Sequence, residues 1–351
     1  MNDTDPRVEL IRGWLRDELQ WPLRDLRLAS ADASFRRYFR IWDAAGATRI
    51  VMDAPPDRED IGPYLQVSGL LADCGVHVPL IDAADTDRGL VLLEDLGSTH
   101  MLAELQNGGD VDALYQQALL SLTDIQLRGA AAAALLPRYD ATVLMREMLL
   151  MPEWFCARHL QLPAAAAHPP VLQQTLQFLV GEILQQPVVL VHRDYHSRNL
   201  MITGERSPGI IDFQDALAGP VGYDLASLLK DCYIAWPRAQ AEDWVLGHYR
   251  RLQQRGATLG ADPREFLRWF DLVGLQRHIK VLGIFARLWY RDGKRGYLAD
   301  LPRTLEYVRD TAGRYSELAA FSTWVEQQLV PALPLANQRA LAPAALAAAL
   351  S

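Results

Sequence analysis

The spacing of hydrophobic positions divides the chain into a short strand-rich part and a longer helical part. After a candidate helix cap at Thr4 or Asp5, apolar residues recur at helical spacing up to residue 19. From residue 26 to 53, aromatic and β-branched residues form short runs around the turn-like DAAGA, which predicts a hairpin or meander. A short helix at 61–76 and a strand at 89–97 follow. Together these elements predict a small lobe with an antiparallel sheet.

The remaining sequence is mainly helical in pattern. Apolar residues at steps of three and four predict helices over about 110–125, 140–159, 171–184, 223–235, 241–254 and 266–290. Only PVVLVH, NLMIT and PGIIDF have strand character there, and the tail from Pro331 fits either a last helix or a frayed end. We therefore predict an α+β protein with an N-terminal lobe at 1–96 and a larger, mainly helical C-terminal lobe at 97–351.

Polar residues crowd between two of these short strands, in VLVHRDYHSRNLMIT. Asp194 can accept a proton from a substrate hydroxyl, and Asn199, five residues later, can offer an amide oxygen to Mg²⁺. Asp212 stands at the end of the next apolar run, where a carboxylate can bind the same hard cation. The pattern predicts phosphoryl transfer, with Asp194 as the catalytic base and Asn199 and Asp212 as metal ligands.

Composition excludes several other classes of protein. The chain has 351 residues and a net charge of −8, whereas a nucleic-acid-binding protein normally carries a basic surplus. Its three cysteines are far apart and form no CxxC pair, which argues against a disulfide framework or a thiolate metal site. No segment approaches the ~20 apolar residues of a membrane span, and the first residues lack the features of a secretory signal. We expect a cytoplasmic protein with no nucleic-acid or membrane partner, and the sequence carries no signal for an oligomeric state.

At these motifs the chain resembles a known family. HRDYHSRNLM followed by IIDFQDA is similar to the catalytic and metal-binding motifs of the aminoglycoside phosphotransferase-like kinases, a branch of the protein-kinase-like fold. The resemblance implies a two-lobed fold, ATP as co-substrate and Mg²⁺ as cofactor. It gives His192 a scaffold role in the loop, and it makes Asp224, in GPVGYDLASLL, a residue that braces the catalytic loop.

The sequence departs from the kinase pattern at the nucleotide phosphates. Kinases hold them with a strand lysine paired to a helix glutamate, but Met52 or Asp53 stands at the lysine position and the helix 61–76 contains no glutamate. The replacements we expect are the arginines of SADASFRRYFRI, although these could instead solvate an exposed strand face. The nucleotide-binding candidates are Ala33 and Ser34 for close backbone approach, Arg36, Arg37 and Arg40 for charge, and Glu94 and Leu96 for backbone contacts to adenine.

The acceptor is predicted from the charge of a later segment. Residues 275–303 carry eight basic groups against two acids, which suits a neutral or anionic hydroxyl compound rather than a polycation. Lys280 and Arg287 are seven residues apart and share a helix face, and Trp289 could stack on a sugar, although core packing is the more common use of such a ring. His196 fits substrate contact or loop packing equally well. These four are the candidate substrate-binding residues.

The whole layout looks like the bacterial anomeric kinases of cell-wall sugar recycling. That resemblance implies ATP-dependent phosphorylation of N-acetylmuramate and N-acetylglucosamine at the C1 hydroxyl. Two alternatives stay open: a choline-, homoserine- or fructosamine-type kinase of the same fold, and a catalytically inactive kinase-like scaffold. The missing lysine and glutamate favour the scaffold, whereas the presence of Asp194, Asn199 and Asp212 opposes it.

Overall fold

The computed structural model describes residues 5–31, 35–260 and 262–342. The chain divides into two compact units, one formed by Met1–Ile125 with Arg198–Ala216 and the other by Gln126–Ser197 with Leu217–Ser351. In this division the first unit continues to Ile125 and includes Arg198–Ala216, whereas the predicted boundary follows residue 96.

The first unit contains a five-stranded antiparallel sheet with the order β1-β2-β3-β5-β4. Aromatic and β-branched residues are concentrated in β2 and β3, and Gly46 makes the tight turn between these two strands with a φ of 92° that L side chains rarely adopt. The predicted small antiparallel sheet is confirmed. Its strands are β1 (Leu23–Ala31), β2 (Arg37–Asp43), β3 (Thr48–Asp53), β4 (Ile81–Asp85) and β5 (Leu90–Glu94).

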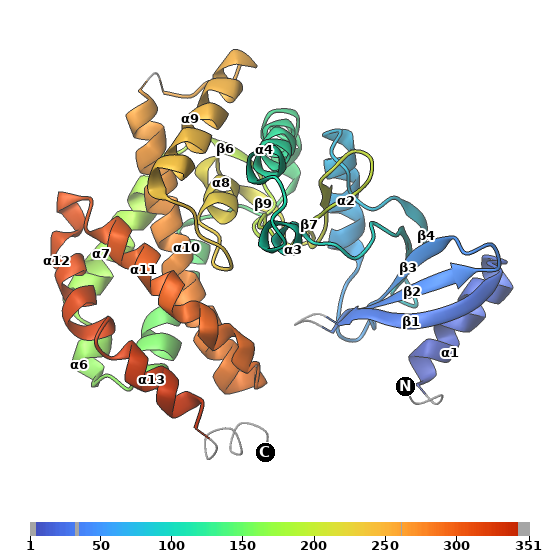
Figure 1. Ribbon diagram of the computed structural model, residues 1–351, viewed down its shortest axis with the longest axis horizontal. Helices are drawn as coiled ribbons and strands as arrows, with labels where there is room; N and C mark the ends of the chain where they lie inside the picture. Colours follow the sequence, from blue (N-terminus) through green and yellow to red (C-terminus); the bar gives the residue numbers. More distant parts are fainter. Residues whose placement is uncertain (1–4, 32–34, 261, 343–351) are drawn as a thin grey trace. The chain divides into compact units, whose positions relative to one another are not determined.

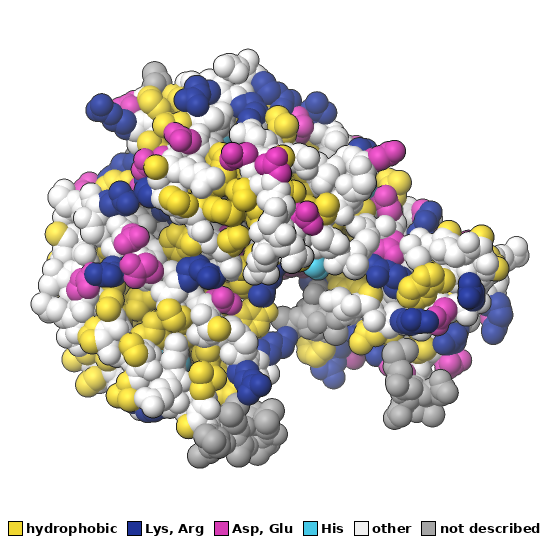
Figure 2. All heavy atoms as spheres, viewed as in Figure 1, with side chains coloured by type: hydrophobic (Ala, Val, Ile, Leu, Met, Phe, Trp, Pro, Cys, Tyr) yellow, Lys and Arg dark blue, Asp and Glu magenta, His cyan; other side chains and the backbone are white. Residues whose placement is uncertain are grey.

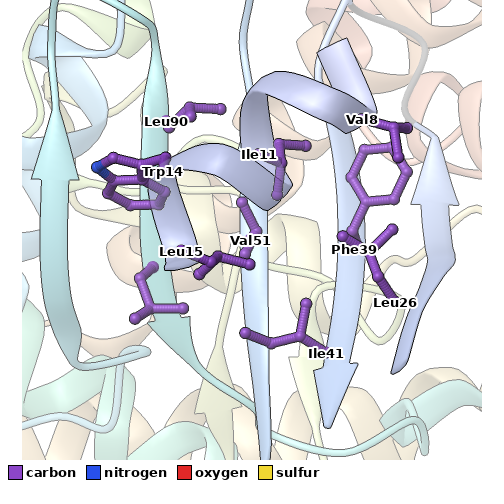
Figure 3. Packing of buried hydrophobic residues seen from close by; sticks show 10 residues of the cluster. Val8, Ile11, Trp14, Leu15, Leu26, Phe39, Ile41, Val51 and Leu90 are labelled. Atoms are coloured by element: carbon purple, nitrogen blue, oxygen red, sulfur yellow. The ribbon is translucent and has the colours of Figure 1, made fainter. Parts of the chain in front are cut away.

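A helix at the N-terminus covers one face of this sheet. In α1 (Pro6–Gly13), Asp5 is the cap and its side chain accepts a hydrogen bond from the Arg7 amide at 2.9 Å. Apolar residues of α1 and the following π-helical turn Trp14–Glu18 pack on inward-facing strand residues (Figure 3), namely Leu26, Phe39, Ile41, Val51 and Leu90. The alternation along β2 and β3 therefore assigns odd-numbered positions such as Phe39 and Val51 to the α1 face.

A short hairpin from the later sequence completes the first unit. Strands β7 (Leu200–Met201) and β8 (Gly209–Ile210) pair antiparallel. The Ile210 amide donates to the His77 carbonyl at 2.7 Å, and the Ile202 amide donates to Thr99 at 2.8 Å. These bonds fix Asn199 and Asp212, which flank the hairpin, within the first unit. The unit also contains α2 (Gly62–Asp73), α3 (Met101–Gln106) and most of α4 (Val111–Arg128).

The second unit is mainly helical, as predicted. Its longest element, α10 (Pro263–Asp292), begins at the cap Asp262 and ends at Gly293, whose φ of 66° stops the helix (Figure 1). Two strands, β6 (Val188–Val191) and β9 (Leu217–Pro220), pair antiparallel. The other helices are α5 (Ala141–Met148), α6 (Ala164–Ala167), α7 (Pro170–Ile183), α8 (Gly222–Leu229), α9 (Arg238–Gln254), α11 (Leu301–Ala312), α12 (Ala319–Trp324) and α13 (Leu333–Ala340).

Two helix boundaries differ from the prediction. The helix predicted over 223–235 ends at Leu229, because Lys230 leaves the helical conformation, and Lys230 and Asp231 are both buried. The helix predicted over 140–159 is divided into α5 and a π-helical segment Met151–His159 that contains Pro152. The tail from Pro331 forms α13, and its last nine residues lie outside the described part.

Charges of both signs share the surface. On the face drawn in Figure 2, Lys and Arg side chains are interspersed with Asp and Glu side chains. None of the helices in the described ranges is long and apolar enough to span a membrane.

Candidate active site

The first unit contains a cavity of about 280 Å³ beside its sheet. Tyr38, Arg40 and Ile50 line it from β2 and β3, and Glu94 and Leu96 line it from the end of β5. Asn199 and Asp212 line it from the β7–β8 hairpin. Both predicted hinge residues and both predicted metal ligands are therefore placed around one cavity.

The predicted hinge is held by ionic contacts. Arg40 donates to both carboxylate oxygens of Asp95, at 2.6 and 2.9 Å, and to the Gly97 carbonyl at 2.7 Å. The Glu94 amide donates to Leu80 at 2.8 Å, so this amide already has a partner. Arg40 lines the cavity, but its charge is paired with Asp95 and its main effect is to fix the hinge.

The arginines before and at the start of β2 lie on opposite faces of the sheet. Arg37 faces α1, where it binds Asp53 at 2.6 Å and Asp5 at 2.5 Å. The structure therefore does not bring Arg37, a predicted nucleotide-binding residue, to the cavity, because both ends of its guanidinium are paired with acids on the α1 face. Arg36 lies on the other face, and its guanidinium is 3.6 Å from an oxygen of Asp212. Ala33 and Ser34 lie outside the described residues.

Asn199 and Asp212 are in contact. The Asn199 Nδ2 lies 3.3 Å from Asp212 Oδ2, and the Ile211 amide donates to the Asn199 carbonyl at 3.1 Å. Asp212 has a φ of 64°, unusual for a residue with a side chain, and Gln214 donates to its Oδ1 at 3.0 Å. The amide of Asn199 can present its oxygen after a flip, so the pair fits two ligands of a hard cation. No cluster of three or more His, Cys, Asp or Glu residues suited to a metal occurs in the described residues.

In the second unit, the loop after β6 is held from three directions. Asp224 accepts the His192 amide at 2.7 Å with one oxygen and the Arg193 amide at 2.9 Å with the other. Arg277 donates to the Arg193 carbonyl at 2.8 Å, and the Asp194 amide donates to His192 Nδ1 at 3.3 Å. Arg193 has a φ of 82°, a conformation that needs such support.

A second cavity, of about 160 Å³, opens beside this loop. Asp194, His196 and Lys280 line it, together with Tyr233 and Phe285. The His196 ring packs edge-on against Tyr233 at 5.5 Å between centroids. The cavity therefore combines the predicted base with two predicted substrate-binding residues and an aromatic wall.

The surroundings of Asp194 keep its carboxylate charged. Burial alone would raise its pKa, but four neighbouring basic groups outweigh this effect and the net pKa is lowered. In decreasing order of effect, these groups are Lys280, His196, Arg277 and Arg193. A carboxylate that is already ionised can accept a hydrogen bond and then a proton from an alcohol.

Lys280 is held by a buried acid. Its Nζ lies 3.1 Å from Glu147 and 3.2 Å from the Tyr223 hydroxyl. Glu147 also accepts hydrogen bonds from Arg193 and Tyr139. Burial raises the pKa of Glu147, but Lys280, Arg193 and the Tyr139 bond lower it more. The cluster fixes Lys280 at the wall of the cavity.

Comparison with known proteins identifies the family. Residues 25–265 match the family described as "Phosphotransferase enzyme family". The chain belongs to this family. It is 43% identical over 329 residues to the "N-acetylmuramate/N-acetylglucosamine kinase" of Pseudomonas putida, covering 91% of this chain and 96% of that protein. It is 44% identical over 314 residues to the protein of the same name from Neisseria meningitidis serogroup B, covering 88% and 92%.

Two solved structures share the fold of this chain. The ethanolamine kinase of Plasmodium vivax superposes with a TM-score of 0.59 at 13% identity, covering 88% of this chain and 89% of that one. A GDP complex of aminoglycoside 2'-phosphotransferase-IIIa gives 0.59 at 14%, covering 89% and 100%. The predicted protein-kinase-like fold is thus confirmed.

Two predicted substrate-binding residues are not brought to the cavity. Trp289 is only 2% exposed and its ring packs against Tyr290, 6.3 Å away between centroids. Arg287 shares a helix with Lys280, but it does not line the cavity, and burial lowers the pKa of its guanidinium. The aromatic residues that do line it include Phe285 and Tyr297, whose rings lie 5.1 Å apart. Spacing along the helix locates a side chain only to within about one turn. It therefore could not show whether Arg287 and Trp289 face the cavity or the interior.

Three acids that contact residues in or beside the candidate site were not predicted from the sequence. Asp231 accepts the Ser197 hydroxyl at 2.5 Å and the Ser197 amide at 3.1 Å, which holds the end of the loop. Glu147 holds Lys280, and Glu59 lies 3.6 Å from Arg36. The only sequence signal was the charged KDC after an apolar helix for Asp231. Glu147 and Glu59 act on distant residues and leave no local pattern.

Proposed function

We propose that this protein is an ATP-dependent kinase that phosphorylates N-acetylmuramate and N-acetylglucosamine at the C1 hydroxyl to give sugar 1-phosphates, in the cytoplasmic recycling of peptidoglycan. The observation that carries this proposal is the 43% identity to a kinase named for both sugars, over 91% of this chain. Membership of the phosphotransferase family and an ionised Asp194 in a cavity support the same reaction.

Asp194 is the proposed catalytic base. It orients the acceptor hydroxyl and takes its proton as the oxygen attacks the terminal phosphorus of ATP, while ADP leaves. An anomeric hydroxyl is more acidic than an ordinary alcohol, so a carboxylate with a lowered pKa is a sufficient base. His192 and Asp224 keep the loop in place through their backbone contacts.

The first cavity is the proposed nucleotide site. Leu96 and the backbone near Glu94 face adenine, and Asn199 and Asp212 are the protein ligands of Mg²⁺. When bound, the ion neutralises charge on the nucleotide phosphates. The contact between Asn199 and Asp212 supports this assignment, because the two side chains already converge on one point of the cavity wall.

The second cavity is the proposed sugar site. Two basic side chains, Lys280 and Arg277, line this cavity. Two acids, Asp194 and Asp231, line it as well, so the acceptor meets charges of both signs. The lactyl carboxylate of N-acetylmuramate is a suitable partner for Lys280, whereas a quaternary ammonium would be repelled by it. Tyr233 and Phe285 offer an apolar surface to a sugar ring, and His196 offers a polar contact.

The experiment measures ADP release by the purified protein with Mg²⁺ and ATP and a panel of acceptors. N-acetylmuramate and N-acetylglucosamine should stimulate release, while choline, homoserine and an aminoglycoside should not. Turnover with choline but with neither sugar would overturn the substrate assignment. No acceptor-dependent release at all would favour the inactive scaffold.

A further inference from the structure

At the position that a strand lysine occupies in kinases, this chain has an apolar residue, Met52, on the cavity side of the sheet. Tyr38 and Arg40 of β2 pair with Met52 and Ile50 of β3, and three of these four residues line the first cavity. Alternation along β3 turns Met52 to the same face and Asp53 to the α1 face, where Asp53 binds Arg7 and Arg37. Thus β3 itself supplies no cation to the nucleotide phosphates.

A cation lies next to the cavity. Arg36 directly precedes β2 and is not itself one of the residues that line the cavity, but its guanidinium lies 3.6 Å from Asp212, which does line it. The Arg36 side chain is 8% exposed, which is unusual for an arginine. A buried guanidinium requires charge compensation from its surroundings.

Two carboxylates provide this compensation. Arg36 Nη2 lies 3.6 Å from Asp212 Oδ1, and Arg36 Nε lies 3.6 Å from Glu59 Oε1. Both separations exceed a normal hydrogen bond, so these two contacts are electrostatic. Glu59 comes from the segment between β3 and α2, and its amide is fixed by the Pro55 carbonyl at 2.9 Å.

We propose that Arg36 and Glu59 form the ion pair that replaces the strand lysine and helix glutamate of kinases, with Arg36 binding the polyphosphate of ATP. This inference rests on the proposed function. Arg36 contacts the nucleotide, whereas Glu59 is a positioning residue that acts through Arg36. A guanidinium has five N–H donors in a planar fork, which suits bidentate binding of phosphate oxygens. The proposed cation and its acid therefore both come from segments next to the positions that the strand lysine and the helix glutamate occupy in kinases.

The test measures the affinity for nucleotide by calorimetry, with EDTA present to remove metal and with no sugar. Arg36→Met should weaken ATP binding at least 10-fold and leave adenosine binding unchanged, because adenosine lacks phosphates. The affinity of Arg36→Lys for ATP should lie between those of Arg36→Met and the native protein, because lysine keeps the positive charge but lacks the planar arrangement of N–H donors. The matched control is Arg49→Met, because Arg49 of β3 faces Trp21 and pairs with Asp82 at 2.5 Å. This control should bind ATP within twofold of the native protein.

Kinetics with the sugar give the second readout. Arg36→Met should lower kcat/KM for ATP by roughly 10²–10³-fold, as expected for loss of one preorganised charge at the transferred group. Glu59→Gln should lower it about 10-fold, and adding Glu59→Gln to Arg36→Met should cause no further loss.

Three results would overturn the inference. They are metal-free ATP binding unchanged in Arg36→Met, equal weakening of ATP and adenosine binding, and additive effects of the two substitutions. Failure of the native protein to phosphorylate either sugar would refute the proposed function instead, since ATP binding is measured without sugar.

Discussion

Replacing Asp224 with Asn tests how the catalytic loop is held. The carboxylate accepts two backbone amides, at 2.7 and 2.9 Å, and lies 1% exposed. A carboxamide can accept only one of them, and its NH₂ group faces the other. The substitution therefore removes one bond to a charged acceptor and leaves a buried amide without a partner.

The magnitude follows from these contacts. Loss of such a bond, with a buried donor left unpaired, costs about 1.5–3 kcal/mol. That amount is comparable to the ~1–3 kcal/mol needed to hold a non-glycine residue such as Arg193 at a φ of 82°. Loss of one bond therefore removes about as much free energy as the conformation of Arg193 costs, so we expect the loop to relax and Asp194, the next residue, to move with it. We expect kcat to fall about 10- to 100-fold.

The assay separates a loop effect from general damage. Urea unfolding should show a loss of about 1.5–3 kcal/mol. Binding of ADP should be unchanged, because Asp224 and the residues lining the nucleotide cavity belong to different units. The control is Asp140→Asn, because Asp140 caps α5 through one bond to the Val143 amide at 2.9 Å and Asn caps helices equally well. Asp224→Asn with native stability and native kcat would refute the reasoning.

Three further predictions concern catalysis and stability. Asp194→Asn should lower kcat by roughly 10²–10⁴-fold while calorimetric ADP binding stays nearly native, and a native kcat would remove Asp194 as the base. Asp271, which binds Lys230 at 2.7 Å and also Arg238, has a pKa far below its usual value because these cations outweigh burial. Asp271→Asn should cost about 3–5 kcal/mol in urea unfolding, since it leaves Lys230 charged and buried. The control Glu242→Gln, which removes the half-buried i,i+4 partner of Arg238, should cost about 1 kcal/mol or less. Burial lowers the pKa of both His248 and His278 to about 3, so each stays neutral in the folded chain while the unfolded chain takes up protons below about pH 6.5. Their contribution to stability should therefore be complete well above that pH and fall by about 3 kcal/mol between pH 6.5 and 5, and an equal unfolding free energy at both values would contradict this.

The candidate catalytic and metal-binding residues could be predicted because their sequence signals are local. Asp194, Asn199 and Asp212 lie in short polar interruptions of apolar runs, and the structure places Asn199 and Asp212 in contact. Asp5 was one of two candidate caps, and the proline after it indicated the helix start. Their roles in catalysis and metal binding stay predictions until variants are measured.

The partners of these residues could not be predicted, because they depend on strand register and long-range packing. Arg36 and Arg37 are adjacent in sequence, yet Arg36 lies near Asp212 and Arg37 binds Asp53 on the α1 face. The missing helix glutamate left no hint that Glu59, outside the predicted helix, would lie near Arg36. Lys280 was found from the basic segment, but its acid Glu147 is 133 residues away in the sequence.

The position of the transferred phosphate tests the central claim most directly. The purified protein is incubated with Mg²⁺, ATP and N-acetylglucosamine, and the product is examined by phosphorus NMR and by an assay for the reducing end. The account predicts a phosphorus signal coupled to the anomeric proton, with one reducing end lost for each ADP released. A product that keeps its reducing end, such as a 6-phosphate, would contradict it.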